Sequence, residues 1–328
     1  MTMQRRRFLR LGGGALAAPA FAKYASAQAA YPNRVIRIIV GFPPGGGADA
    51  STRIIASRLA EIWNAQVVVE NKPGAGGNIA HDNAAHAAPD GYTMLFSPGS
   101  LPIMPLLFNG LNYDPIKDLV PISLLGVYPN LVVVSKISEI QTLQEYIARA
   151  KANPGRVTYA SPGIGSTPQL AAEYFKSMAK VDITHVPYRG VAAGAMTDLL
   201  ANRVDSMFNT TGSLLASVRA GQTRALAAST PKRFPLAPDI PTFAESGVPG
   251  FEVVSWYGLF APAKTPRDIL QKINQGVVQA IAEPATKAKF EALGVVAESS
   301  QPEKLAELMQ AEIKLWGPII KSAGIKGE

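Results

Sequence analysis

The chain lacks cysteine altogether, and only three histidines occur among its 328 residues. Without cysteine there is no disulfide bond, no lipid anchor on a thiol and no thiol chemistry. Beyond Ala27, no apolar run approaches the roughly 20 residues that a membrane-spanning helix needs. We therefore expect the mature chain to be soluble, to have no membrane span and to fold without oxidative cross-links.

The first 27 residues have the layout of an export signal. Arg5-Arg6-Arg7 is followed by Phe8-Leu9, by an apolar stretch over residues 11–22, and by the small-residue cleavage site Ala25-Ser26-Ala27. Paired arginines before a short apolar stretch are typical of the twin-arginine route. We predict that residues 1–27 are a signal peptide and that the mature protein is periplasmic.

Export changes what the net charge indicates. The whole chain has a formal charge of +8, which by itself favours nucleic-acid binding. Residues 1–27 hold five of the 32 Lys and Arg residues and no acid, which leaves 27 basic against 24 acidic residues. The mature part has no basic run, so nucleic acid is not expected as a partner.

Strand-like and helix-like segments alternate along the chain. Residues 35–40, 67–69 and 92–96 are β-branched or apolar runs, and a helix is expected to begin near Asp49. The unit recurs at residues 157–160, where Thr167 suits a helix N-cap and Pro168 the first helical position. This alternation predicts an α/β fold of parallel sheets covered by helices.

The repeated unit and the length together predict two lobes. We place residues 28–127 and 252–328 in the first lobe and residues 128–251 in the second. The chain is expected to cross near residues 131–134 and to return before residues 256–261, after which two C-terminal helices rejoin the first lobe. Two crossover segments form a hinge that suits closure around a ligand.

Two glycine-rich turns lie where a strand leads into a helix. Gly45, Gly46 and Gly47 precede one helix, and Gly165-Ser166-Thr167 precedes another. A helix N-terminus has unpaired N–H groups and a partial positive charge, so it binds anions without Lys or Arg. If the lobes face each other, the two turns could hold opposite ends of a molecule with two carboxylates.

A dinucleotide site is the main rival interpretation. Gly45-x-Gly47-x-x-Ala50 follows a strand, and Glu70 ends the next strand, which matches the dinucleotide fingerprint. Pro43-Pro44, however, removes two N–H donors just before the glycines. No acid–base pairing is evident elsewhere, so an exported NAD-dependent oxidoreductase is the less favoured reading.

We expect no catalytic residues, no metal and no cofactor. His81 and His86 are five residues apart, which places them on different faces of a helix, and we expect both, with Asp82, to be polar surface residues. Ser161 and Ser166 have no histidine close in sequence, so they are expected to bind ligand or to cap helices. Asp49 is expected to cap its helix and to shape the glycine turn, or else to contact an amine.

A set of motifs, in order along the chain, resembles one protein family. These are YP at residues 31–32, VGFPPGGGAD at 40–49, VENKPGAGG at 69–77, PDGYT at 89–93, HVPYRG at 185–190, IPTFAESG at 240–247 and WYGLFAP at 256–262. The combination resembles the Bug family, the TctC-type solute-binding receptors of tripartite tricarboxylate transporters. The resemblance covers nearly all of the mature chain.

This resemblance implies a two-lobe, type II-like periplasmic-binding-protein fold with two crossover segments. It further implies that backbone amides and water hold a carboxylate beside the turn at residues 42–47, and that Glu70 belongs to a family motif rather than an NAD site. The second lobe would contact the rest of the ligand through residues 161–167 and 208–209. The ligand-binding residues expected on both grounds are Phe42, Pro43, Pro44, Gly45, Gly46, Gly47, Asp49, Ser97, Ser161, Gly165, Ser166, Thr167, Asn209 and Thr210.

The sequence departs from the family where the pocket is expected. Family members often have Asp in place of Asn209, and His or a comparable polar residue in place of Gln169. A neutral amide disfavours an ammonium group, so we expect a di- or tricarboxylate or an aromatic acid without an amine. Transporter membrane subunits are the expected partners of a monomer, and ligand presentation to a sensor is the alternative.

Overall fold

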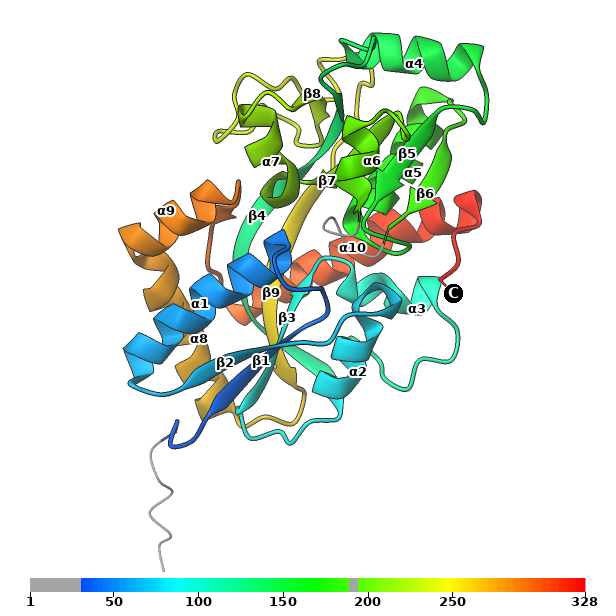
Figure 1. Cartoon of the computed structure of the whole chain (residues 1–328). Coiled ribbons are helices and arrows are strands. Elements are labelled where there is room, and N and C mark those ends of the chain that lie inside the picture. Colours follow the sequence, from blue (N-terminus) through cyan, green and yellow to red (C-terminus); the bar gives the residue numbers. More distant parts are fainter. Residues whose placement is uncertain (1–30, 189–193, 328) are drawn as a thin grey trace, which may run out of the picture.

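The structure is a computed structural model that describes residues 31–188 and 194–327. Two lobes are stacked one above the other, and strands run from one into the other (Figure 1). The signal peptide expected at residues 1–27 lies outside the described residues. Within residues 31–188 and 194–327, no helix has the length and apolar character needed to cross a bilayer.

The first lobe is built on a mixed sheet. Its parallel part pairs β1 (Ile36–Val40) with β2 (Val67–Asn71) on one side and β3 (Thr93–Pro98) on the other. β3 then pairs antiparallel with β9 (Val254–Pro262). Ile36, Ile38, Ile39 and Val40 are wholly buried, as expected for a strand covered on both faces. The helices of this part of the chain are α1 (Gly47–Trp63), α2 (Asn78–Ala85), α8 (Arg267–Ala282) and α9 (Pro284–Ala292).

The second lobe repeats the arrangement around its own core. β5 (Thr158–Ser161) pairs parallel with β6 (Thr184–Pro187) and β7 (Ser206–Thr210), and β8 (Thr223–Ala228) pairs antiparallel with β4 (Leu119–Ser135). Phe175, Phe208 and Phe243 pack against one another at the centre. The helices of this lobe are α4 (Leu143–Ala152), α5 (Thr167–Ala179), α6 (Met196–Leu200) and α7 (Thr211–Arg219).

Two long strands connect the lobes. In β4 (Leu119–Ser135), residues up to Pro129 pair with β9, whereas residues from Asn130 onward pair with β7 and β8. Both strands run between the lobes in Figure 1. The two-lobe α/β fold with two crossovers, expected from the sequence, is confirmed. The lobe boundaries set at residues 127/128 and 251/252 stay predictions, since the first falls inside β4 and the second just before β9.

The C-terminal part differs from expectation, because three helices follow β9 rather than two. The third, α10 (Pro302–Ala323), begins beside the first lobe, where Leu305 packs with Phe260. It ends in the core of the second lobe, where Trp316 and Ile320 join Phe175. This helix therefore links both lobes, in addition to the two crossover strands.

One helix start agrees with the sequence prediction and one is shifted. α1 begins at Gly47, two residues before Asp49, near which its start was expected. The N-cap of α5 is Ser166 rather than Thr167: the Ser166 backbone is extended and its hydroxyl accepts a hydrogen bond from the Gln169 N–H. Ser and Thr both favour this position, so the sequence alone could not choose between neighbours. The shift leaves Thr167 as the first residue of the helix and Pro168 as the second.

Candidate ligand-binding site

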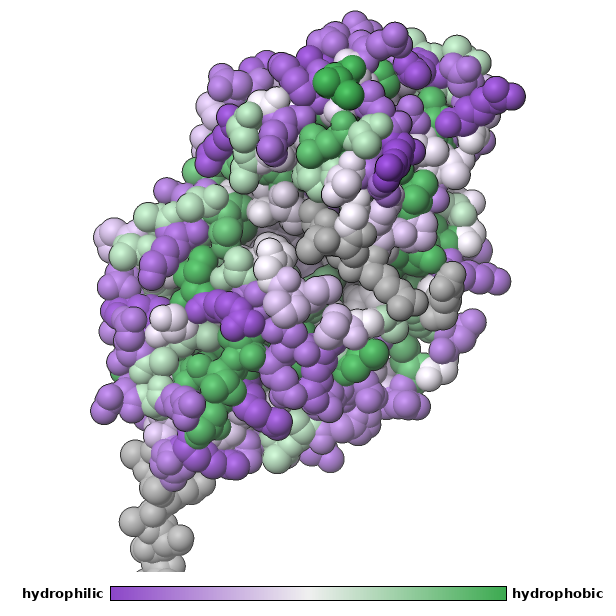
Figure 2. Space-filling model, in the orientation of Figure 1, coloured by the Kyte–Doolittle hydropathy of each residue, from purple (hydrophilic) through white to green (hydrophobic). Residues whose placement is uncertain are grey.

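A cavity of about 620 Å³ lies where the two lobes and the crossover strands meet. The surface at this junction is pale in Figure 2, the colour of residues of intermediate hydropathy, whereas much of the outer surface of each lobe is purple. Ten of the residues expected from the sequence line the cavity: Phe42, Pro43, Pro44, Gly45, Gly46, Gly47, Ser166, Thr167, Asn209 and Thr210. Asp49, Ser97, Ser161 and Gly165 are not among its lining residues.

The turn between β1 and α1 forms the first-lobe wall. Gly45 adopts φ +83°, a backbone conformation that glycine reaches without strain. The N-cap of α1 is Gly46, which has no side chain to bond the free N–H groups of the first turn. These N–H groups are therefore left available to a ligand.

Asp49 fixes the shape of this turn from behind. Its buried carboxylate accepts hydrogen bonds from the Gly45 N–H at 2.9 Å and from Asn71 Nδ2 at 2.8 Å, and it pairs with Arg53. Burial alone would raise the pKa of Asp49, but Arg53, the Gly45 N–H and Asn71 together hold it below its ordinary value. Asp49 therefore shapes the glycine turn, as expected from the sequence. It does not cap the helix, because its carboxylate accepts from Gly45, Asn71 and Arg53 rather than from the N–H groups of the first turn.

The loop before α5 supplies a second helix N-terminus. The Ser166 hydroxyl donates to the Gly163 carbonyl at 2.7 Å and accepts from the Gln169 N–H at 3.4 Å. Gln169 Oε1 accepts from the Gly165 N–H at 3.3 Å. Gln169 therefore acts on the shape of the loop, and it is not among the residues that line the cavity.

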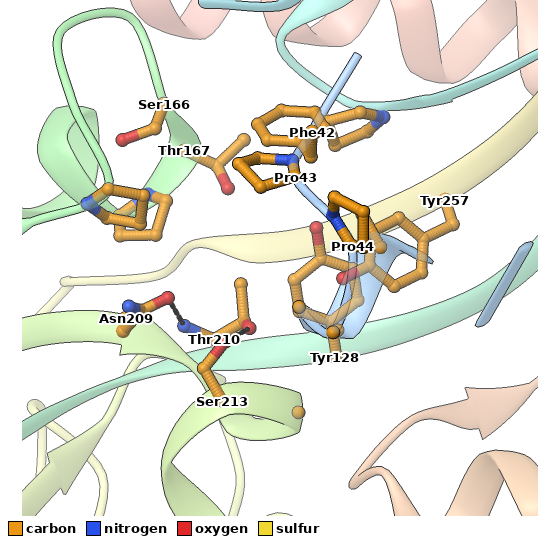
Figure 3. Close-up of a pocket in the computed structure, with 18 of the residues that line it drawn as sticks. Phe42, Pro43, Pro44, Tyr128, Ser166, Thr167, Asn209, Thr210, Ser213 and Tyr257 are labelled. Carbon is orange, nitrogen blue, oxygen red and sulfur yellow. Dashed lines mark hydrogen bonds between the residues drawn. The ribbon is translucent and has the colours of Figure 1, made fainter. Parts of the chain in front are cut away.

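A third helix N-terminus reaches the cavity from α7. Thr210 is the N-cap of this helix, and its side chain makes no capping hydrogen bond. Asn209, just before it, accepts from the Thr210 N–H at 2.8 Å through Oδ1, as Figure 3 shows. Its Nδ2 has a single weak contact, the Met207 sulfur at 4.0 Å. An amide donor and a free helix end thus face the same cavity.

Two tyrosines on the crossover strands complete the floor. Tyr128 of β4 and Tyr257 of β9 are almost wholly buried, with ring centroids 4.3 Å apart (Figure 3). The Tyr128 hydroxyl adjoins those of Tyr257 and Thr167, and the Tyr257 hydroxyl adjoins that of Thr210. Burial raises the pKa of both tyrosines, so both stay protonated and can donate hydrogen bonds. Sequence reasoning missed both residues, because a buried aromatic in a strand is most simply explained as core.

In the part of the site that the structure describes, the positive charge comes from the backbone. Among the described residues that line the cavity, none is Lys, Arg, His, Asp or Glu. Three helix N-termini nevertheless meet there, each with roughly half a positive charge. Free N–H groups combined with this partial charge bind anions, so the site is suited to an anion held without an ion pair.

Comparison with known proteins agrees with this geometry. Residues 51–325 match the family described as "Tripartite tricarboxylate transporter family receptor". The chain belongs to this family.

Individual relatives match over nearly their whole length. A protein encoded in the tcbD–tcbE intergenic region of Pseudomonas sp. strain P51 is 37% identical, covering 94% of this chain and 92% of its own. A Rhodopseudomonas palustris protein solved with adipate is 33% identical with a TM-score of 0.86, covering 90% of this chain and 99% of its own. MatC of the same organism, solved with bound malate, is 32% identical with a TM-score of 0.82. The match covers 88% of this chain and 100% of MatC.

Membership settles the choice between a receptor and an enzyme. The family and the structural neighbours are binding receptors, so the protein is not an enzyme and the dinucleotide interpretation of Gly45, Gly47 and Glu70 is wrong. Glu70 instead forms ion pairs with Arg37 and Lys72 at the edge of the first-lobe sheet.

The tertiary structure of this receptor gives Ser161 a histidine partner that is distant in sequence. Ser161 Oγ lies 2.6 Å from His185 Nε2, and the His185 ring stacks on Tyr159. Burial lowers the pKa of His185 to about 4, so it is neutral near pH 7. Ser161 is itself buried and its side chain is held by this pair beneath the loop that precedes α5.

The expectation that His81 lies on the surface is wrong. His81 is buried, with Nδ1 3.1 Å from the Tyr113 hydroxyl and Nε2 2.9 Å from Ser97 Oγ. Burial lowers its pKa to about 3. His86 is exposed and Asp82 is partly exposed, which agrees with the expectation that these two residues lie on the surface. The Ser97 hydroxyl is therefore hydrogen-bonded to His81. In the part of the chain described here, no group of three His, Cys, Asp or Glu residues could hold a metal.

Proposed function

We propose that the protein captures a small carboxylate between its lobes, in the periplasm, and delivers it to the membrane subunits of a tripartite tricarboxylate-type transporter. The observation that carries this proposal is the meeting of three helix N-termini in one cavity whose described lining residues include no ionised side chain. Such a site favours an anion over a cation or a neutral sugar.

The nature of the anion follows from two further observations. The two solved relatives hold adipate and malate, which are both carboxylates. Planar carboxylates accept several N–H and O–H hydrogen bonds at once. Backbone N–H groups at the helix ends, together with the hydroxyls of Tyr128, Thr210 and Tyr257, supply such donors.

Asn209 supports a ligand without an amine. Its side chain is buried and borders the cavity, and its Nδ2 donates only weakly, to the Met207 sulfur. An amide offers an ammonium group no countercharge, whereas it can donate to a carboxylate. We infer that amino acids bind more weakly than the corresponding plain acids.

Localisation and partners form the remaining part of the proposal. The twin-arginine signal expected at residues 1–27 supports export to the periplasm, and a solved relative with a TM-score of 0.84 is described as a periplasmic transporter. The family description supports a transporter partner. We infer that the protein meets these membrane subunits as a monomer.

A thermal-shift screen of the mature chain tests the proposal. The panel holds small mono-, di- and tricarboxylates, with a sugar, an amino acid and a divalent metal as controls. A ligand present at a hundred times its dissociation constant stabilises a protein by about 2.7 kcal/mol, which is readily measured. A shift with at least one carboxylate is expected; a shift with the sugar or the metal and with no carboxylate would overturn the proposal.

A further inference from the structure

Four of the polar side chains that line the cavity lie close together at the helix starts. A methyl group on Gly47, the first residue of α1, would lie 3.4 Å from the Tyr257 hydroxyl and 3.5 Å from Thr210 Oγ1. Tyr128 adjoins both Tyr257 and Thr167. We call Tyr128, Thr167, Thr210 and Tyr257 the hydroxyl cluster. It contacts the starts of α1, α5 and α7 together.

This arrangement points to one anion site. The three helix ends each carry a partial positive charge of about half a unit, so a carboxylate at the point where they meet is stabilised by all three. Because the cluster joins all three ends, a single carboxylate can draw on each of them. We therefore favour one carboxylate bound at this cluster over the alternative in which the two glycine-rich turns hold opposite ends of a dicarboxylate.

The rest of the lining is largely apolar and comes from both lobes; its other polar side chains are Ser166, Asn209 and Ser213. Phe42, Pro43 and Pro44 face the cavity from the first lobe, and Pro162, Pro168 and Met196 face it from the second. Figure 3 shows Phe42 and Pro43 beside the cavity, opposite Ser166 and Thr167. Such surfaces stabilise an apolar ligand body by removing it from water. A second carboxylate placed against these apolar residues, rather than beside Asn209, would lose its hydration without gaining a partner.

We propose that the preferred ligand is a monocarboxylate with a compact apolar body, such as an aromatic or alicyclic ring. The carboxylate binds at the hydroxyl cluster, and the ring lies between Phe42 and Met196. A cavity of about 620 Å³ is within the range of small-molecule sites and accommodates a substituted ring. This inference rests on the proposed function, of which it specifies the ligand class.

Calorimetric titration with four acids tests the inference: benzoate, adipate, malate and citrate. Benzoate is expected to bind at least tenfold more tightly than adipate, and malate and citrate more weakly still. If adipate, malate or citrate binds as tightly as benzoate or more so, the inference is overturned while carboxylate capture stands. If none of the four binds but another acid of the thermal-shift panel does, the inference falls while carboxylate capture stands; if no acid of that panel binds either, both fall.

Two variants separate the two parts of the site. Tyr257→Phe removes one donor to the carboxylate and should raise the dissociation constant of every acid that binds about ten- to a hundredfold. Phe42→Ala should weaken benzoate by about tenfold or more and change the binding of acetate little. Equal losses for benzoate and acetate in Phe42→Ala would contradict the placement of the ring.

A matched control guards against a general loss of folding. Tyr146→Phe removes another buried tyrosine hydroxyl, which bonds Ser206 in the second-lobe core and is not among the residues lining the cavity. It should lower the thermal midpoint without changing affinity. If Tyr146→Phe weakened benzoate as much as Tyr257→Phe does, the effect of Tyr257 would be structural and its assignment to the carboxylate would be wrong.

Discussion

The carboxylate of Asp49 accepts a hydrogen bond from the backbone N–H of Gly45, 2.9 Å away. This contact spans the turn that opens onto the ligand cavity, and Asn71 and Arg53 bind the same carboxylate. The free N–H groups of α1 are consequently held in place by a residue that does not line the cavity. The shape of the anion site therefore depends on the contacts that Asp49, which lies outside the cavity lining, makes with Gly45, Asn71 and Arg53.

Replacing Asp49 by Ala should weaken both the fold and the binding of ligand. The change removes the acceptor of the Gly45 N–H and one of the two acceptors of the Asn71 amide, which keeps its bond to the Phe42 carbonyl. Neither Gly45 nor Asn71 is fully buried, so we expect a loss of about 1 kcal/mol in the free energy of unfolding, measured in urea, and weaker carboxylate binding in calorimetry. Arg53→Ala, which keeps both hydrogen bonds, is the control and should lose less. Unchanged affinity in Asp49→Ala would contradict the role given to the turn.

Two glycines, Gly47 of the first lobe and Gly212 of the second, lie against each other. A methyl group on Gly212 would lie 3.1 Å from the Leu293 carbonyl oxygen and 3.4 Å from the Gly47 Cα. Gly212→Ala should therefore hinder closure and raise the dissociation constant about five- to a hundredfold, as expected for overpacking of 1–3 kcal/mol. Without ligand, the thermal midpoint should change little, because open lobes relieve the contact.

Gly317 offers a matched control for this substitution. A methyl group there would meet nothing nearer than Leu106 Cδ1 at 3.9 Å. Gly317→Ala should therefore bind ligand as the unaltered protein does. Equal affinities for the Gly212→Ala and Gly317→Ala variants would show that closure does not bring Gly47 and Gly212 together.

Asn209→Asp should weaken carboxylate binding by at least about tenfold. The substitution places a negative charge beside a bound anion in a poorly hydrated cavity, where like charges repel strongly. Asn202→Asp makes the same change of net charge at an exposed position and should have no comparable effect. Calorimetry with an acid and the corresponding amino acid measures both affinities. An Asn209→Asp variant that bound the plain acid as before would contradict the position of the ligand beside Asn209.

Glu312 gives the stability of the protein a predictable dependence on pH. Its carboxylate accepts from the indole N–H groups of Trp256 and Trp316, yet burial raises its pKa to about 7. The folded state therefore binds more protons than the unfolded state between the ordinary carboxyl pKa and about pH 7. The stabilisation present at low pH is lost as pH rises through that window.

Urea unfolding of Glu312→Gln checks this dependence. From about pH 5 to about pH 8, the slope of the free energy of unfolding against pH should be more negative in the unaltered protein than in the variant, because the amide does not titrate. Both proteins share every other titrating group, so the difference between the two slopes reports on Glu312. Identical slopes would mean that this carboxyl group titrates near its ordinary pKa in the folded protein.

Local features of the fold and site could be predicted from the sequence, whereas distant pairings could not. Gly45, Gly46 and Gly47 follow a β-branched strand directly, so their place at a helix start is a short-range property. Tyr128 and Tyr257 meet only because β4 and β9 pair across more than a hundred residues of chain. His81 was misplaced for a related reason: its partners Ser97 and Tyr113 arrive from later segments, and no local pattern signals its burial.

The central claim, that helix N-termini and hydroxyl groups hold a carboxylate, is tested most directly by comparing an acid with its own primary amide. The tightest-binding acid of the panel and that amide have nearly the same shape, but the amide is neutral and presents N–H groups to a site made of donors. Calorimetry should show the acid binding at least about a hundredfold more tightly, a difference of roughly 2.7 kcal/mol. Equal affinity for the two, or tighter binding of the amide, would contradict the account.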